Sequence, residues 1–151
     1  MAGTKDLWLE SQAQVRVDKW CEELGWSSRR YGWDVEITVD QSGHIIHVSP
    51  VRIQGTPSLW LVLPLGKFPD HFRGPWDNEA LLFILRRNSE LAIMNWCVTR
   101  EEGLAVQAYR SLDSLDSEKL RVLTRSLIAE RVDFLALVEA GYPDQTVAPA
   151  G

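Results

Sequence analysis

The sequence has few of the residues from which metal sites, redox sites and disulfide frameworks are built. Of its 151 residues only two are cysteines, Cys21 and Cys97, and three are histidines. The cysteines form no CxxC pair and have no neighbouring histidine, which argues against the usual zinc and thiol-redox patterns. Both lie within apolar patterns. We therefore expect buried free thiols, which are typical of a reducing compartment.

A basic excess and a membrane-length apolar run are also absent. The net charge is −5, and the arginine pairs at 29–30 and 86–87 are isolated, whereas nucleic-acid binders usually carry a basic stripe. The apolar run at 59–65 has seven residues, whereas a membrane helix needs about 20. The first six residues do not resemble a signal peptide. We therefore expect a cytoplasmic protein that neither binds nucleic acid nor inserts into a membrane.

Motifs of the common catalytic sites are missing as well. There is no glycine-rich phosphate loop, no serine nucleophile elbow and no HExxH. His44 and His47 are three apart on a predicted strand, so their side chains point to opposite faces and do not share a metal ion through that strand. The acids near the predicted hairpins are interpreted as solvated. The sequence therefore predicts no enzyme, no catalytic residue, no metal and no cofactor.

The apolar run at 59–65 is the segment around which the chain is organised. It does not alternate with polar residues, and Pro57 and Pro64 bracket it, so a buried strand is favoured over a buried helix. We predict the central strand of a sheet. It is either covered on both faces, or covered on one and docked against a partner on the other.

The flanking patterns predict an α+β domain with the order α-β-β-β-α-β-β-α, in which helices pack on an antiparallel sheet. Asp6 and Gly25 delimit the first helix, and Asp77 or Asn78 begins the second, for which Asn88 is a candidate left-handed end. A single domain is expected over 1–143, followed by a disordered tail at 144–151. The predicted helices are 7–24, 78–88 and 117–140; the predicted strands are 34–40, 44–53, 59–65, 91–99 and 104–110, with a polar, aromatic-rich loop at 26–33.

Aromatic side chains are the main candidates for a binding surface. The chain has seven tryptophans, and indoles are enriched where proteins dock. The loop at 66–77 combines prolines, glycines and aromatics, and an exposed cluster of that kind marks a protein-binding site. Core packing is the alternative for each aromatic. The candidate partner-binding residues are Trp60, Phe68, Phe72, Trp76 and Trp96.

Two further hypotheses concern the second helix and the aromatic loop. The apolar residues of the helix at 78–88 belong either to the core or to a dimer surface. The alternative function is a small-molecule sensor or enzyme that uses the loop at 66–77, with Asp70, His71 and Arg73 in a pocket. A third possibility is a structural subunit that only self-associates.

In element order, length and acidity the chain resembles the type III secretion chaperone-like superfamily, including its YbjN-type members. The resemblance covers residues 7–141 and depends on four elements rather than on a diagnostic motif. One cyanobacterial group, the CcmS-type carboxysome assembly chaperones, is similar in size and architecture. The four elements are the first helix with Trp20, the Leu59–Leu65 strand, the Ala80–Leu85 helix and the long final helix.

The resemblance implies a small, acidic, non-enzymatic protein that captures a segment or tail of a client protein, assisting assembly or regulation. Carboxysome assembly is one such role. It also implies a homodimer formed through the second helix and the following strand, here 78–88 and 91–99. The loop at 66–77 departs from the secretion chaperones. The dimer-interface residues that follow are Leu81, Leu82, Leu85 and Met94.

Overall fold

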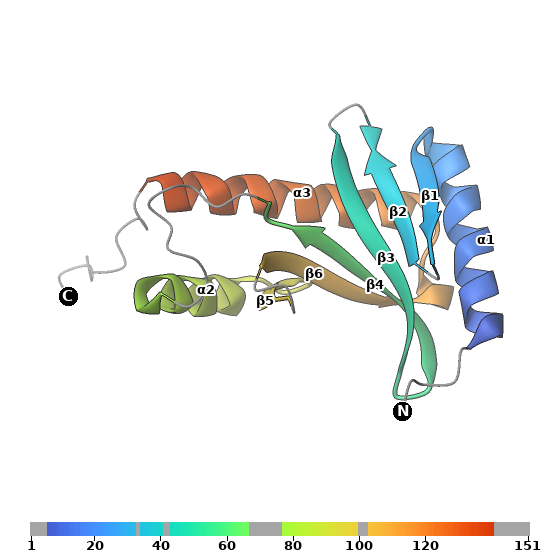
Figure 1. The fold of residues 1–151 in the computed structure, drawn as a ribbon, viewed down its shortest axis with the longest axis horizontal. Helices are drawn as coiled ribbons and strands as arrows, with labels where there is room; N and C mark the ends of the chain where they lie inside the picture. Colours follow the sequence, from blue (N-terminus) through green and yellow to red (C-terminus); the bar gives the residue numbers. More distant parts are fainter. Residues whose placement is uncertain (1–5, 33, 41–42, 67–76, 100–102, 141–151) are drawn as a thin grey trace. The chain divides into compact units, whose positions relative to one another are not determined.

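A computed structural model of the chain describes residues 6–32, 34–40, 43–66, 77–99 and 103–140. Three helices, six strands and a short 3-10 turn follow one another along the described residues (Figure 1). None of the described helices combines the length and apolarity needed to cross a membrane. The elements are α1 (Leu7–Leu24), β1 (Ser27–Tyr31), β2 (Asp34–Val39), β3 (His44–Ile53), β4 (Thr56–Pro64), α2 (Asn78–Glu90), β5 (Asn95–Val98), β6 (Leu104–Ser111), the turn Leu112–Ser114 and α3 (Ser117–Glu139).

The strands are hydrogen-bonded in the order β1-β2-β3-β4-β6-β5. The pairings β1–β2, β2–β3, β3–β4 and β5–β6 are antiparallel. This arrangement confirms the predicted α+β class with an antiparallel sheet. The element order differs from the prediction by one additional strand, β1.

The chain divides into two compact units, each built from segments that are distant in sequence. Unit 1 comprises 1–62 and 108–125, and unit 2 comprises 63–107 and 126–151. Residues of β4, β6 and α3 contribute to both units. The single domain expected over 1–143 stays a prediction.

In unit 1, α1 lies alongside β1, β2 and β3 (Figure 1). Its start is fixed by Asp6, whose carboxylate accepts a hydrogen bond from the Leu9 N–H at 3.1 Å, and its end by Gly25 at φ 73°. Glycine adopts this left-handed conformation without steric cost. The predicted helix is therefore confirmed, caps included. Its buried stripe consists of Leu9, Ala13, Val17, Trp20 and Cys21.

Residues 26–33 contain a strand, so the loop predicted there is wrong. β1 pairs along its whole length with β2, from Ser27 opposite Thr38 to Tyr31 opposite Asp34. Ser-Ser-Arg-Arg-Tyr has no alternation of apolar and polar residues, and all five residues are exposed. Backbone pairing with β2 therefore defines this strand, and side-chain pattern alone could not reveal it.

The central position of β4 between β3 and β6 confirms the prediction for the apolar run. In unit 1, Leu59 and Leu61 are fully buried, whereas Trp60 and Val62 are half-buried. Successive strand residues point to opposite faces. One face of β4 therefore belongs to the core and the other remains partly accessible.

In unit 2, α2 begins at the predicted cap, because the Asp77 carboxylate accepts from the N–H groups of Glu79 and Ala80. Asn88 lies inside the helix, which continues to Glu90, so the prediction that Asn88 ends it in the left-handed region is wrong. The Asn88 side chain instead bonds the Trp96 backbone at 2.6 and 3.0 Å. β5 starts only at Asn95 and is shorter than predicted.

The last helix, α3, agrees closely with the prediction. Asp116 caps it by accepting from the Lys119 N–H at 2.8 Å, and the helix runs to Glu139. The expected tail at 144–151 lies outside the described residues. In unit 2 the buried residues of α3 are Leu127, Glu130, Phe134 and Val138.

Candidate functional site

The outer face of α2 exposes two large apolar side chains. Leu82 is 55% exposed and Leu85 is 65% exposed, whereas Ala80, Phe83 and Ile84 are buried. Residues three apart on a helix are neighbours on its surface. Leu82 and Leu85 therefore form one apolar patch, which we call the α2 patch.

An ion pair between half-buried Arg87 and buried Glu130 fixes the inner face of α2. Glu130 of α3 is only 5% exposed, and its carboxylate accepts two hydrogen bonds from the Arg87 guanidinium, one of them at 2.8 Å from Nε. The carboxylate raises the pKa of Arg87 above its ordinary value, mainly through these bonds. Such bidentate pairs are geometrically specific. The pair therefore sets the rotation of α2 and with it the direction of the α2 patch.

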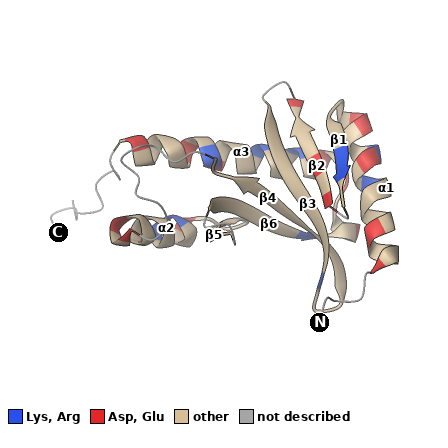
Figure 2. Ribbon diagram, in the orientation of Figure 1, with Lys and Arg blue, Asp and Glu red and all other residues tan. Residues whose placement is uncertain are grey.

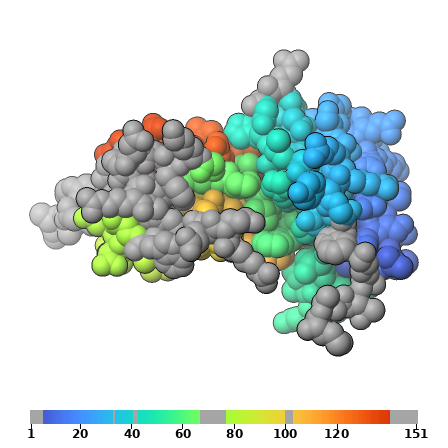
Figure 3. Space-filling view, viewed as in Figure 1, coloured from blue at the N-terminus to red at the C-terminus, as the bar shows by residue number. Residues whose placement is uncertain are grey.

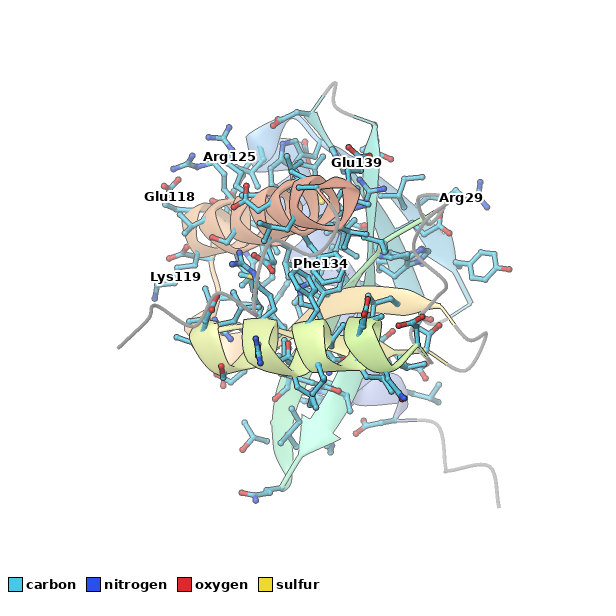
Figure 4. All side chains as sticks on the ribbon, turned by 90° about the vertical axis from the view of Figure 1, so that its left-hand side faces the viewer. Arg29, Glu118, Lys119, Arg125, Phe134 and Glu139 are labelled. Atoms are coloured by element: carbon cyan, nitrogen blue, oxygen red, sulfur yellow. The ribbon has the colours of Figure 1, made fainter. Side chains whose placement is uncertain are left out.

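Trp96 belongs to the same polar network. Its indole N–H donates to Glu130 Oε2 at 2.8 Å, and its ring centroid lies 4.1 Å from that of Phe134. Phe134 also meets Phe83 of α2 edge-on, at 5.2 Å. Figure 4 shows Phe134 on the side of α3 that faces α2. With 3% of its surface exposed, Trp96 is a core residue of unit 2, which is the alternative that the sequence left open.

Arg131 of α3 binds the backbone at the end of β4. Its guanidinium donates to the carbonyl oxygens of Pro64 and Leu65 at 3.1 and 2.6 Å. A Cβ added at Gly66 would lie 3.0 Å from Arg131 Nη2, and Gly66 adopts φ 87°. The chain therefore requires glycine where β4 leads into residues 67–76.

In unit 1, Trp60 is half-buried and stacks on Tyr109 of β6. The ring centroids are 5.9 Å apart and the planes are 5° from parallel. Tyr109 is itself exposed, so the pair offers an aromatic platform on the accessible face of β4. The sequence singled out Trp60 but not Tyr109, whose position opposite Trp60 depends on the β4–β6 neighbour relation.

A second group of exposed apolar side chains in unit 1 was missed by sequence reasoning. Trp8 in the first turn of α1 is 55% exposed, and Leu7 and Ile53 are exposed as well. The Arg52 guanidinium lies 5.7 Å from the Trp8 ring centroid and donates to the Asp6 carboxylate at 2.5 Å. The cation–π contact holds the indole in place. A tryptophan at the start of an amphipathic helix was the available signal.

Six residues of the predicted sites lie outside the described residues. Three are the candidate partner-binding residues Phe68, Phe72 and Trp76. The other three are Asp70, His71 and Arg73, on which the alternative small-molecule site depends. Of the predicted dimer residues, Leu82 and Leu85 are exposed, Leu81 is half-buried and Met94 is buried.

The described residues include no group of three or more metal-ligating side chains. His47 lies 3.9 Å from Glu36 on the neighbouring strand. Both cysteines are free thiols. Burial raises the pKa of Cys21 to about 12 and also raises that of the half-buried Cys97. Thiols with raised pKa values are poor nucleophiles at neutral pH. Cys21 fits the prediction of a buried free thiol, whereas the prediction is wrong for Cys97, which is only half-buried.

Comparison with known proteins identifies the fold. No family model matches the sequence, and no curated protein matches it either. Among solved structures, the chain is similar to the Yersinia pestis type III secretion chaperone SycH, determined in complex with a stable fragment of YscM2. The TM-score is 0.58 at 16% identity, over 83% of this chain and 98% of that chain. The predicted type III secretion chaperone-like fold is thus confirmed, while the YbjN-type and CcmS-type resemblances remain predictions.

Proposed function

We propose that this chain is a non-enzymatic, chaperone-like module that captures a segment of a partner protein. The observation that carries the proposal is the α2 patch, in which Leu82 and Leu85 are exposed on a helix whose opposite face is fixed by the ion pair of Arg87 with buried Glu130. The fold supports it, because SycH was solved with a fragment of another protein bound. Similarity of fold alone does not assign function, so the proposal depends on the exposed α2 patch as well.

A rigid apolar helix face favours docking for two reasons. Covering Leu82 and Leu85 removes apolar surface from water, which stabilises the complex by about 25 cal/mol per Å² buried. Because Arg87 and Glu130 already fix the helix, little conformational entropy is lost when a partner binds. A partner with an amphipathic helix or an extended apolar segment would fit such a surface.

The finer assignments follow from the same surfaces. We propose that Leu81, Leu82 and Leu85 contact a second copy of the chain when no client occupies the α2 patch; Met94, also predicted for this contact, is buried. Trp60 with Tyr109 serves as an aromatic anchor for the client, and Phe68, Phe72 and Trp76 remain candidate anchors. Trp96 acts as an internal support rather than as a contact. Carboxysome assembly gains no support from the comparisons, so the proposal names a class of client and not a pathway.

The α2 patch is tested by placing a charge on it. Leu82→Asp and Leu85→Asp should abolish self-association or client capture at an unchanged melting temperature, because an exposed site accepts a charge but an apolar interface does not. Mass is measured by light scattering, and clients by affinity capture followed by cross-linking mass spectrometry.

Val132→Asp is the matched control, since Val132 is an exposed apolar residue of α3 in the same unit. It should leave both readouts unchanged. If the α2 variants retain the mass and the captured proteins of the unmodified chain, the α2 patch is not the binding surface and the proposal fails.

A further inference from the structure

β1 is an edge strand in which every side chain is exposed. It lies at one end of the strand order, so β2 is its only neighbour among the described strands, and all five residues from Ser27 to Tyr31 are exposed. Figure 3 shows β1 to β3, in blue to turquoise, at the surface of unit 1. A strand of this kind contributes little hydrophobic stabilisation to the sheet.

The side-chain contacts of β1 with α1 are polar and open to water. Ser28 Oγ donates to Asp18 Oδ1 at 2.9 Å, and Arg30 lies 3.7 Å from Asp18 Oδ2, with 61% and 41% of the two side chains exposed. Exposed ion pairs contribute little to stability. Backbone pairing with β2 therefore provides most of what holds β1 in place.

A glycine at positive φ lies next to each end of β1, but only the N-terminal one is tied to a helix, as the cap of α1. Gly25 precedes it at φ 73° and Gly32 follows it at φ 64°, and a Cβ added at either glycine would meet no atom of the described residues within 4 Å. Trp26, between Gly25 and the strand, is anchored separately because its indole N–H donates to Asp40 at 2.7 Å. The N-terminal side of β1 is therefore fixed, and Gly32 is the position at which the other end can change direction without a side-chain clash.

The residues that β1 covers are very different from β1 itself. Ser28 lies opposite Ile37, and Arg30 lies opposite Val35. Ile37 is fully buried and Val35 is 1% exposed. Directly opposite residues of an antiparallel pair share a face of the sheet. The edge of β2 therefore offers backbone groups for pairing with another strand, next to the apolar side chains of Val35 and Ile37. Ser28 and Arg30 bury little apolar surface against these side chains.

We propose that β1 is a displaceable stand-in for an extended segment of a partner polypeptide, which adds to the edge of β2 in its place. The incoming strand carries an apolar side chain at the Ser28 position, where it packs beside Ile37. It carries a basic side chain at the Arg30 position, where it keeps the ion pair with Asp18. Figure 2 shows that acidic residues recur along α1 beside this edge. The inference rests on the proposed function and adds a second, self-occupied binding site to it.

The first test weakens the side-chain contacts that hold β1 in place and leaves β2 unchanged. The probe is a fluorescently labelled peptide of residues 26–32 with valine in place of Ser28, and binding to the full chain is followed by anisotropy. S28A/R30A should bind the peptide about fivefold more tightly than the unmodified chain, because the competing strand is bound less often. R29A is the control, since Arg29 points away from the sheet (Figure 4) and lies on the opposite face to Ser28 and Arg30. Equal affinity for the three proteins, or no binding by any of them, would overturn the inference.

The second test locks the strand. Ser27 and Thr38 are directly opposite, a separation that a disulfide spans, so S27C/T38C joins β1 to β2 when oxidised. Peptide binding should fall at least tenfold on oxidation and return on reduction.

A third measurement uses the unmodified chain: backbone hydrogen–deuterium exchange should be faster in β1 than in β3.

The two proposals fail separately. If β1 amides are as protected as those of β3, or if the oxidised lock still binds the peptide, β1 is a fixed edge strand and this inference is wrong. Client capture through Leu82 and Leu85 is measured without the peptide, and its outcome decides the proposed function independently.

Discussion

The helices α1 and α2 begin in the same way but are stabilised by different forces. Each starts at an aspartate cap, Asp6 or Asp77. α1 buries five residues of its eighteen in one apolar stripe, and its ion pairs are exposed. α2 buries three of thirteen and depends on the contact between half-buried Arg87 and buried Glu130.

This difference predicts how the stability of each helix should respond to the loss of one side chain. Apolar burial is divided over many contacts, so losing one side chain removes only its share. A buried carboxylate that accepts several hydrogen bonds concentrates its contribution in one residue, because removing it deprives all of its donors at once. α2 is therefore held precisely with few contacts, which leaves its outer face available, whereas most of α1 is committed to the core.

Breaking the pair of Arg87 with Glu130 should have the largest effect. Glu130→Ala removes the acceptor of both the Arg87 guanidinium and the Trp96 indole. We expect a loss of about 3–5 kcal/mol in the free energy of unfolding, because three hydrogen bonds to a charged group are lost. Urea denaturation measures it. Glu90→Ala is the control, because Glu90 pairs with the same arginine at 3.3 Å but from an exposed position, where a loss below about 0.5 kcal/mol is expected. Similar losses for the two variants would contradict the assignment of a buried network.

Shortening the apolar stripe of α1 should cost less. Leu9→Ala at a fully buried position is expected to lower the free energy of unfolding by about 2–4 kcal/mol through lost burial and a cavity. Leu7→Ala, two residues away on the exposed side, should change it by at most about 0.5 kcal/mol. The pair compares the same substitution in the same helix, and a large effect at Leu7 would show that the outer surface of α1 is not idle.

The two free thiols report on the two units separately, since Cys21 lies in unit 1 and Cys97 in unit 2. At about pH 8 a thiol reagent should label half-buried Cys97 faster than Cys21, because the thiolate is the reactive form and burial suppresses it more at Cys21. Leu9→Ala should then accelerate labelling of Cys21 alone, and Glu130→Ala that of Cys97 alone. Mass spectrometry assigns the labelled site.

The pKa shift of Cys21 adds a pH dependence with a defined sign. The unfolded thiol ionises near its ordinary value of 9.0, whereas the folded thiol stays neutral until about 12. The free energy of unfolding should therefore be independent of this thiol below about pH 9 and fall as the pH rises from there toward 12. Cys21→Ser should remove that decline.

In the labelling experiment, equal rates at Cys21 and Cys97 would contradict the difference in burial between the two thiols.

The sequence predicted the elements whose boundaries are encoded locally. Asp6, Gly25, Asp77 and Asp116 are caps whose side chains or backbone act within a few residues, so α1, α3 and the start of α2 were predictable. β4 was predictable because its apolar run is bracketed by prolines. In each case the signal lies inside the element itself.

Elements and contacts defined by distant residues were not predictable in the same way. β1 exists because β2 pairs with it, and Asn88 continues the helix because its amide is engaged by Trp96, eight residues later. Glu130 was missed although a signal existed, since it follows Leu127 by three residues and precedes Phe134 by four. A carboxylate at that spacing within an apolar stripe indicates a buried acid, but its partners emerge only when α2 and α3 are placed in space.

The interlocked group of Arg87, Asn88, Trp96 and Glu130 also provides a fingerprint for distant homologues. Because each side chain depends on the others, a lineage that keeps this fold should retain or replace the four as a set. The spacing is an Arg-Asn pair, a tryptophan eight residues after the asparagine, and a glutamate thirty-four residues after the tryptophan. Searching for that spaced quartet offers a way to recover relatives whose overall identity has fallen too low for ordinary alignment.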